Sequence, residues 1–409
     1  MSRKNSIVFT PAHIGGLEIK NRLVRSATAD ALATERGEVS DVMVDIYGKL
    51  AAGGVGLIIT GGVIVDTTSA FYGFPRVDND SFIPGLSRVS KAVRKVNPNC
   101  KVILQLAHSG RQMPVLSKMI PLLPPLFLAW VTKHPEVINE AGKIHEMPEP
   151  IAPSALYDTL FERIPRALRL EEINKIVDAF ALAICRAKEA GFDGVQIHAA
   201  HGYLLSTFLS PRTNVRNDKY GGSTENRARI VTDICALARK KVGEDFPIMI
   251  KMNTTDFLPG GMDTGEAVRI GDLLSQAGLS AIETSGGMWE CLTLSKEELG
   301  WEPVLLPESR TGIKSREQEA YFLPGAAALK EKVKIPIILV GGLRSFSRIK
   351  EILESGAADF IALSRPLIRQ PDLPALWKSG KGQDKAECIS CNGCFPPGIG
   401  GFGCRAKAE

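Results

Sequence analysis

The 409-residue chain has few of the features that mark a membrane, secreted or nucleic-acid-binding protein. No apolar run reaches the roughly 18 residues that a membrane-spanning helix needs. The opening segment Met1–Asn5 has neither the apolar core nor the small-residue cleavage site of a secretory signal. The formal net charge of +5 is modest, and a solvated surface with a slight excess of lysine and arginine explains it. We therefore expect a cytoplasmic protein with no membrane span and no nucleic-acid partner. The oligomeric state is left open.

Cysteine is scarce, and its 8 residues are unevenly placed. Some lie in or beside apolar segments, as is typical of cysteines that fill a core: Cys100, Cys185, Cys235 and Cys291. The others gather near the C-terminal end of the chain: Cys388, Cys391, Cys394 and Cys404. The hydrophobic content of 44% and the charged content of 23% are typical of a globular protein.

Short apolar runs recur along the chain, with amphipathic segments between them. Most of the runs are continuously apolar, as expected of strands that are covered on both faces. They are Leu23–Thr28, Val55–Gly61, Lys101–Ala107, Gly194–Ala200, Ile248–Asn253, Ala281–Gly287, Ile335–Gly342 and Phe360–Arg365. The predicted helices between them include Leu170–Gly191, Thr224–Val242, Thr264–Ala277 and Ser345–Ser355. This alternation predicts an α/β fold, a (β/α)8 TIM barrel over residues 1–375, with a cysteine-rich tail over residues 376–409.

Two segments exceed what a minimal barrel requires. Residues 113–150 form an insertion after the third strand, and their apolar part, residues 119–131, is interrupted by prolines. This insertion is either a lid over the mouth of the barrel, an apolar surface for a partner or membrane, or a loop packed on its own barrel. The second segment, Gly286–Gly325, contains Trp289 and Trp301 and is a candidate border of the substrate site.

The end of the fourth strand carries the most informative motif of the chain. His198 and His201 leave this strand close together, and Tyr203 follows at once. Two imidazoles can polarise a carbonyl oxygen, and a nearby phenol can protonate the adjacent carbon. A shared metal is the weaker interpretation because two ligands are too few, and two ordinary half-buried histidines are the remaining alternative.

Polar residues also follow other strands, at the rim where the active sites of such barrels lie. Gln105 and His108 come from the third strand, and Lys251 comes from the fifth. The pair Gly341-Gly342 after the seventh strand and the pair Ser364-Arg365 after the eighth suggest a phosphate site. Backbone N–H groups can approach an anion closely at the glycines, and the arginine offers a bidentate fork.

With these residues in place, the chain resembles the Old Yellow Enzyme family of NADH:flavin oxidoreductases, from about residue 7 to residue 374. The resemblance is closest to the branch of 2,4-dienoyl-CoA reductase and trimethylamine dehydrogenase. The motifs that carry it are Leu17-Glu-Ile-Lys-Asn-Arg22, Gln105-Leu-Ala-His-Ser-Gly-Arg-Gln112, His198-Ala-Ala-His-Gly-Tyr-Leu204 and Tyr220-Gly-Gly-Ser-Thr-Glu-Asn-Arg227.

The resemblance implies an FMN that lies across the mouth of the barrel. Gln105 and Lys251 would face its pyrimidine edge, where many relatives have arginine in place of the lysine. The other implied cofactor residues are Ser26, Ala27, Thr28, Gly61, Gly341, Gly342, Ser364 and Arg365. One position departs from the pattern: Ala29 stands where relatives place a side chain that hydrogen-bonds the flavin O4, and the alternative is that Thr28 takes this place. The flavin of this chain is therefore expected to be a weaker oxidant.

The implied activity is reduction of the C=C bond of α,β-unsaturated carbonyl compounds, with NADH or NADPH as the reductant. His198 and His201 would bind the oxygen of a small-molecule enone or enoyl substrate, and Tyr203 would donate the proton. Two alternatives stay open. One is an amine dehydrogenase or demethylase, and the other is a flavin and iron–sulfur electron-transfer component that serves a redox partner protein.

The cysteine tail predicts a metal site. The spacing of Cys388, Cys391 and Cys394, with Cys404 after them, is more typical of a [4Fe–4S] cluster than of zinc, which prefers two separated pairs. It also resembles the cluster-binding segment of the larger relatives in this branch. A structural zinc, or no metal at all, are the alternatives.

Overall fold

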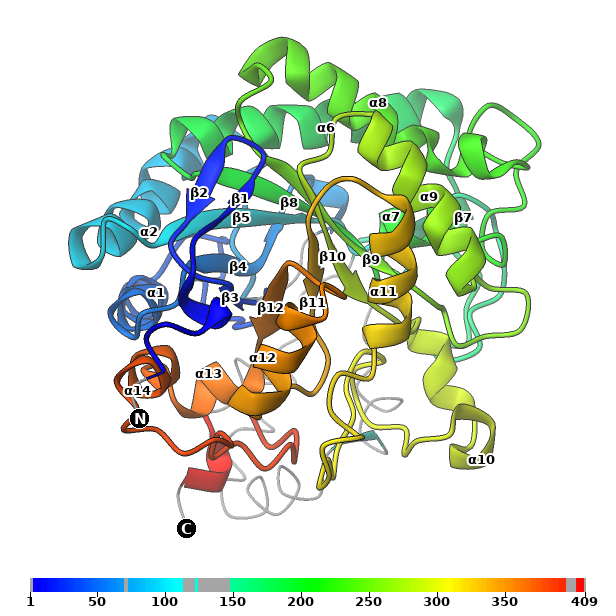
Figure 1. The fold of residues 1–409 in the computed structure, drawn as a ribbon. Helices are drawn as coiled ribbons and strands as arrows, with labels where there is room; N and C mark the ends of the chain where they lie inside the picture. Colours follow the sequence, from blue (N-terminus) through cyan, green and yellow to red (C-terminus); the bar gives the residue numbers. More distant parts are fainter. Residues whose placement is uncertain (1–2, 70–72, 113–121, 124–147, 395–401, 408–409) are drawn as a thin grey trace.

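The computed structural model describes residues 3–69, 73–112, 122–123, 148–394 and 402–407. Its centre is a closed barrel with the strand order β10-β11-β12-β3-β4-β5-β8-β9 (Figure 1). Neighbouring strands are parallel throughout. The strands are β3 (Leu23–Arg25), β4 (Leu57–Ile64), β5 (Lys101–Ala107), β8 (Gly194–Ala199), β9 (Ile248–Asn253), β10 (Ala281–Ser285), β11 (Ile337–Leu339) and β12 (Phe360–Leu363). The predicted (β/α)8 barrel is confirmed.

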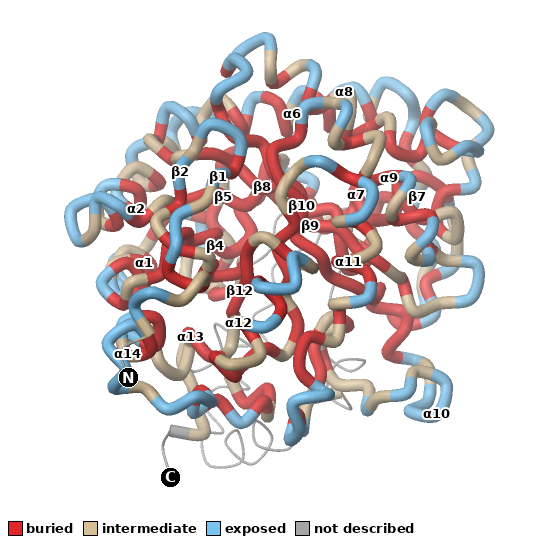
Figure 2. The backbone as a smooth tube through the Cα atoms, viewed as in Figure 1, coloured by how far each residue is buried: buried red, intermediate tan, exposed pale blue. Residues whose placement is uncertain are grey.

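Helices cover the outside of the barrel. The main ones are α1 (Asp41–Ala52), α2 (Ile83–Val96), α6 (Leu170–Glu189), α8 (Thr224–Val242), α9 (Thr264–Gln276), α11 (Leu323–Lys332), α12 (Phe346–Glu354) and α14 (Leu373–Ser379). Their inner faces are buried against the strands and their outer faces are exposed, as Figure 2 shows. Side-chain caps begin several of them: Ser40 accepts from the Met43 N–H, and Ser223 accepts from the Asn226 N–H.

The inside of the barrel has its own core, which a hairpin closes at the end opposite the site. This hairpin pairs β1 (Ala12–Ile14) with β2 (Leu17–Ile19) in an antiparallel ladder. Its Ile14 and Ile19 are fully buried against side chains inside the barrel such as Ile103 and Phe360. The inside of the barrel at this end is therefore apolar.

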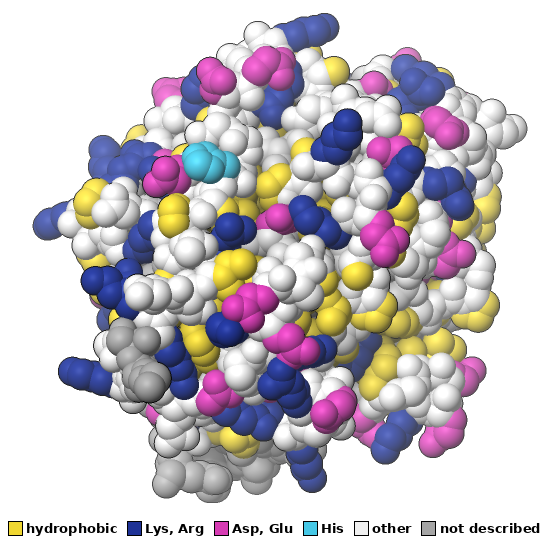
Figure 3. All heavy atoms as spheres, viewed as in Figure 1, with side chains coloured by type: hydrophobic (Ala, Val, Ile, Leu, Met, Phe, Trp, Pro, Cys, Tyr) yellow, Lys and Arg dark blue, Asp and Glu magenta, His cyan; other side chains and the backbone are white. Residues whose placement is uncertain are grey.

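The insertion predicted over residues 113–150 lies almost wholly outside the described residues, so its role as a lid or partner surface stays a prediction. After it, β6 (Ile151–Ala152) and β7 (Arg166–Ala167) form a short parallel pair that leads into α6. In the described part of the chain, no helix combines the length and apolar character needed to cross a membrane. The face seen in Figure 3 mixes both signs of charge, in agreement with the modest net charge.

Candidate functional site

The three residues of the strand-four motif form one cluster of rings. The His198 ring centroid lies 5.2 Å from that of His201 and 4.9 Å from that of Tyr203. Both histidines are buried, and Tyr203 is half-buried at the start of α7 (Leu204–Leu209). The structure therefore brings the predicted carbonyl-binding pair and the predicted proton donor together.

The backbone around His201 is shaped to aim its ring. His201 has a φ of 64°, in the left-handed region that non-glycine residues rarely occupy outside functional sites and turns. Its N–H donates to Asn253 Oδ1 at 3.1 Å, which holds this turn against the end of β9. Its Nε2 lies 2.7 Å from Ser285 Oγ at the end of β10. The Nδ1 atom therefore lies on the side of the ring that faces away from Ser285.

Burial sets the protonation states of the cluster. The pKa values of His198 and His201 are both well below the usual value, mainly because burial disfavours the imidazolium and also because Lys251 is positively charged. Burial raises the pKa of Tyr203, and the carboxylate of Glu308 raises it further. At neutral pH the site thus presents two neutral imidazoles and a protonated phenol.

Glu308, from the segment after β10, reaches this cluster. Its Oε2 lies 3.9 Å from His201 Nδ1 and is buried without a hydrogen-bond partner among the described residues. Burial raises the pKa of this carboxyl group. Nearby, the Arg310 guanidinium lies 3.1 Å from the centroid of the Trp301 ring and also faces Phe257 and Tyr321. The chain's own arginine therefore occupies this group of aromatic rings.

A second group of site residues lies inside the barrel and forms a continuous hydrogen-bond network. Gln105 Nε2 donates to Gln196 Oε1 at 2.8 Å, and Gln196 Nε2 donates to Glu283 Oε2 at 2.7 Å. Ser26 Oγ donates to Glu283 Oε1 at 2.6 Å, and Lys251 Nζ lies 3.1 Å from the same oxygen. The predicted cofactor residues Ser26, Gln105 and Lys251 are thus joined through Gln196 and Glu283.

The predicted phosphate residues follow the ends of the neighbouring strands β11 and β12. Gly341 and Gly342 have φ values of 127° and 70°, which other residues rarely adopt. Ser364 Oγ lies 2.8 Å from Thr28 Oγ1, so that the end of β12 contacts the segment after β3. Arg365 Nη1 donates to Arg310 O at 2.9 Å and to Asn392 Oδ1 at 2.5 Å, which directs this side chain toward the cysteine tail.

Gly61, in contrast, has a packing reason to be glycine. A Cβ at this position would lie 2.7 Å from the backbone oxygen of Thr28, and the Gly61 N–H donates to the Tyr47 hydroxyl at 2.9 Å. Ala27, the residue between Ser26 and Thr28, packs against the core inside the barrel. Their predicted contacts with the cofactor stay predictions.

The residues at this rim fit an FMN. His198 Nδ1 is buried with no hydrogen-bond partner among the described residues, as expected of a donor or acceptor that awaits a ligand. Gly341 and Gly342 follow the end of β11, and without side chains their backbone N–H groups can approach an anion closely. Lys251 supplies a buried cation beside Ser26, and the Arg365 backbone follows β12 while its side chain is directed toward Asn392.

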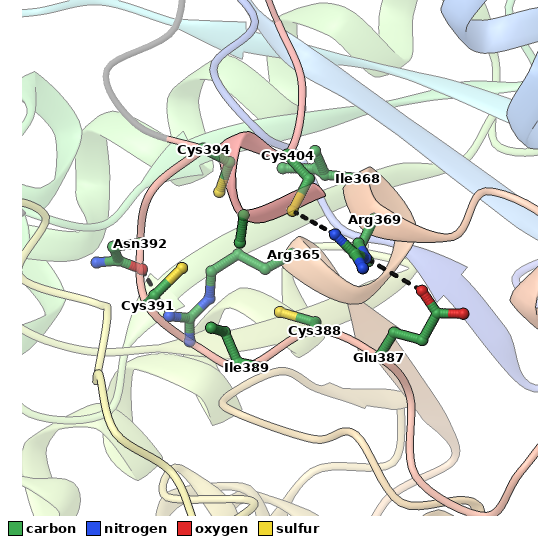
Figure 4. A pocket seen from close by; sticks show the side chains of 11 residues that line it. Arg365, Ile368, Arg369, Glu387, Cys388, Ile389, Cys391, Asn392, Cys394 and Cys404 are labelled. Atoms are coloured by element: carbon green, nitrogen blue, oxygen red, sulfur yellow. Dashed lines mark hydrogen bonds and ion pairs between the residues drawn. The ribbon is translucent and has the colours of Figure 1, made fainter. Parts of the chain in front are cut away.

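The cysteine tail returns to the barrel and lines a cavity of about 60 Å³ (Figure 4). Cys388, Cys391, Cys394 and Cys404 all line it, together with Arg365 and residues of α13 (Arg365–Arg369). Arg369 Nη1 contacts Cys404 Sγ at 3.8 Å. Within the described residues, however, no three histidine, cysteine, aspartate or glutamate side chains are arranged to hold a metal ion. The four predicted ligands thus share a cavity, and their metal stays a prediction.

Four residues that border the site were not predicted from the sequence: Gln196, Glu283, Ser285 and Glu308. For two of them the sequence contains a signal that could have identified them. Gln196 is two residues before His198, so strand periodicity places both side chains on one face. Glu283 is a carboxylate within an otherwise uncharged strand, which is costly unless it is paired. Ser285 and Glu308 had no comparable signal, because only the folded chain brings them to His201.

Comparisons with known proteins agree with this geometry. The profile of the NADH:flavin oxidoreductase / NADH oxidase family matches residues 7–384, and the chain belongs to this family. A curated relative, NADH oxidase of Thermoanaerobacter brockii, is 34% identical over 95% of this chain and 53% of its own length. The resemblance to the Old Yellow Enzyme family is thereby confirmed.

Two solved structures are among the similar ones. A 2-naphthoyl-CoA reductase in complex with 2-naphthoyl-CoA has a TM-score of 0.79 and 26% identity, over 94% of this chain and 54% of that one. Histamine dehydrogenase from Rhizobium sp. 4-9 has a TM-score of 0.71 and 25% identity, over 92% of this chain and 48% of that one. The chain spans about half the length of these proteins and of the curated NADH oxidase.

Proposed function

We propose that this chain is an FMN-dependent, NADH- or NADPH-driven reductase of the C=C bond in α,β-unsaturated carbonyl compounds, conjugated thioesters included. The observation that carries the proposal is the ring cluster of His198, His201 and Tyr203, with neutral imidazoles beside a protonated phenol. The family match and the fold at the rim support the cofactor. The similarity to 2-naphthoyl-CoA reductase, whose structure holds a CoA thioester, supports the substrate class.

Each residue of the site has its own role in the proposed reaction. FMN, when bound, supplies a hydride for the β-carbon of the alkene, and the nicotinamide restores it. His198 and His201 hold the carbonyl oxygen and stabilise the negative charge that develops there. Tyr203 gives its proton to the α-carbon, which completes the addition of one hydride and one proton across the double bond. Ser285 fixes the His201 ring, and Asn253 fixes its backbone.

An amine oxidation is the second candidate, and one observation favours it. Glu308 places a carboxyl group 3.9 Å from His201 Nδ1, where an ammonium group could be bound. Against it, Arg310 already occupies the aromatic rings around Trp301 that would otherwise attract a substrate cation. The carbonyl reaction therefore remains the preferred proposal.

The cysteine tail is proposed to hold an iron–sulfur cluster, with structural zinc as the alternative. The donor set fits, since four thiols line one cavity and three of them have the spacing of cluster ligands. A cluster there would supply one-electron transfer between the flavin and a redox partner protein.

The experiment that tests the main proposal is an anaerobic titration of the NADH-reduced holoprotein. Cyclohexenone should reoxidise the flavin promptly, and substitution of both histidines by alanine should slow this step by at least about 100-fold. Histamine added to the oxidised holoprotein should leave the flavin oxidised. Reduction of the flavin by the amine, with no response to cyclohexenone, would replace the proposal by the amine reaction.

A further inference from the structure

The buried carboxylate of Glu283 has no part in the reaction described so far. It lies in the middle of β10 and is completely buried. It receives hydrogen bonds from Ser26 and Gln196 and forms an ion pair with Lys251. Ser26 and Lys251 are residues of the proposed flavin site, and Gln196 bonds to a third one, Gln105.

Lys251 is the cation that the proposed function places at the pyrimidine edge of FMN. Its ammonium nitrogen also lies 3.0 Å from Ser26 Oγ, so the lysine is held inside the network by two partners. An unpaired cation there would favour reduced FMN, which carries more negative charge on this edge than oxidised FMN. A paired one has far less effect, because the carboxylate cancels the lysine charge at short range, where interior screening is weak.

We propose that Glu283 lowers the reduction potential of the bound flavin by neutralising Lys251. The amides of Gln105 and Gln196 form a hydrogen-bond chain that connects Glu283 to the pyrimidine edge. This inference rests on the proposed FMN site. Glu283 is a positioning and tuning residue and does not touch the substrate. Its effect has the same direction as the lack of a hydrogen-bonding side chain at Ala29.

The network allows the charge to be removed with little other change. In the variant Glu283→Gln, one amide oxygen still accepts from Ser26 and Lys251. The new NH₂ group then faces Gln196. Rotation of the Gln196 and Gln105 amides by half a turn restores each hydrogen bond, because the two ends of a glutamine amide are nearly equal in shape. Packing is preserved, but the flipped Gln105 amide presents its other end to the pyrimidine edge. The comparison with Glu283→Asp, which keeps the charge and needs no amide flip, therefore separates the effect of the charge from that of the flip.

The test is the midpoint potential of FMN in the holoprotein, measured by anaerobic equilibration with reference dyes. In Glu283→Gln, reduced FMN should be bound at least about tenfold more tightly relative to oxidised FMN, which is a rise of about 30 mV for a two-electron couple. Glu283→Asp keeps the charge and should shift the potential by less. Gln196→Glu, which adds a carboxylate to the same network, should lower it.

The matched control is Glu266→Gln. Glu266 is also a buried carboxylate with arginine partners, Arg227 and Arg269, but it lies on α9 outside the barrel. Glu266→Gln should leave the midpoint potential of FMN unchanged. If its midpoint potential rose as much as that of Glu283→Gln, the loss of one negative charge anywhere in the protein would explain the rise. An unchanged or lower potential in Glu283→Gln with FMN bound would overturn the inference. Purified wild-type protein that binds no FMN would instead overturn the proposed function.

Discussion

The phenol ring of Tyr203 lies 4.9 Å from the imidazole ring of His198, at an interplanar angle of 59°. Strand β8 ends between these residues, and the turn through His201 and Gly202 brings the chain back so that both rings face one region. The spacing of an oxygen-binding group and a proton donor is thus fixed by a strand end and one left-handed turn.

Tyr203→Phe should remove the proton donor and leave the oxygen-binding pair in place. We expect flavin reoxidation by cyclohexenone to slow by about 100- to 10,000-fold, the usual contribution of a general acid. Flavin reduction by NADH should keep its rate. Both are followed as stopped-flow absorbance changes under anaerobic conditions. Tyr157→Phe is the control, since Tyr157 is 53% exposed. An unchanged reoxidation rate in Tyr203→Phe would assign the proton to another group.

The buried histidines should make the protein less stable in acid. Burial lowers the pKa of His108 to about 4, and its Nδ1 accepts a hydrogen bond from the Gly110 N–H, which requires the neutral ring. The unfolded chain therefore binds this proton first, and the free energy of unfolding falls as the pH drops from about 6.5 to about 4, by about 1.4 kcal/mol per pH unit for this group.

His108→Asn should remove this contribution and flatten the slope of stability against pH over the same range. The measurement is urea unfolding at several pH values between 4.5 and 7.5. His13→Asn, at an exposed position of the β1–β2 hairpin, should keep the wild-type slope. Equal slopes in wild type and His108→Asn would show that His108 is not buried neutral.

Gly342→Ala tests the predicted phosphate end of the flavin site. The φ of 70° disfavours alanine, and its Cβ would lie 2.6 Å from Ile313 Cδ1 and 2.7 Å from Tyr321 Cε1. We expect a loss of about 1–3 kcal/mol in the free energy of unfolding and weaker FMN retention on gel filtration. Gly300→Ala has nearly the same φ, 73°, with no atom within 4 Å of the added Cβ. Gly300→Ala should be destabilised less than Gly342→Ala and should retain FMN. Equal loss of FMN in both variants would count against a phosphate site at Gly342.

The cysteine tail should bind iron. Protein purified without oxygen should contain iron and acid-labile sulfide by elemental and colorimetric analysis. Cys391→Ser should lose both because it removes one of the four thiols that line the cavity. Cys185→Ser is the control, since Cys185 lies on α6 away from the tail. Zinc in place of iron would support the structural alternative, and protein with neither metal would refute the site.

The barrel was predictable from the sequence because its strands are buried on both faces and their apolar runs are easily recognised. Strand β9 has the predicted bounds, Ile248–Asn253. Strand β11 is shorter than predicted, Ile337–Leu339, since Pro336 lacks an N–H and the positive φ of Gly341 ends the ladder. Strand β4 is longer, because the chain resumes pairing with β5 after an irregularity between Ile59 and Gly62.

The barrel strands, the histidine pair with its tyrosine, and the set of cysteines could all be predicted from the amino-acid sequence, because each strand and each motif is encoded within a short stretch of chain. Three relationships became apparent only in the folded chain: Glu283 pairs with Lys251, Ser285 and Glu308 reach His201, and Arg365 turns toward Asn392. Those contacts join strands and loops far apart in the chain. Their physical origin is the closure of the barrel, which brings the ends of its strands to one rim.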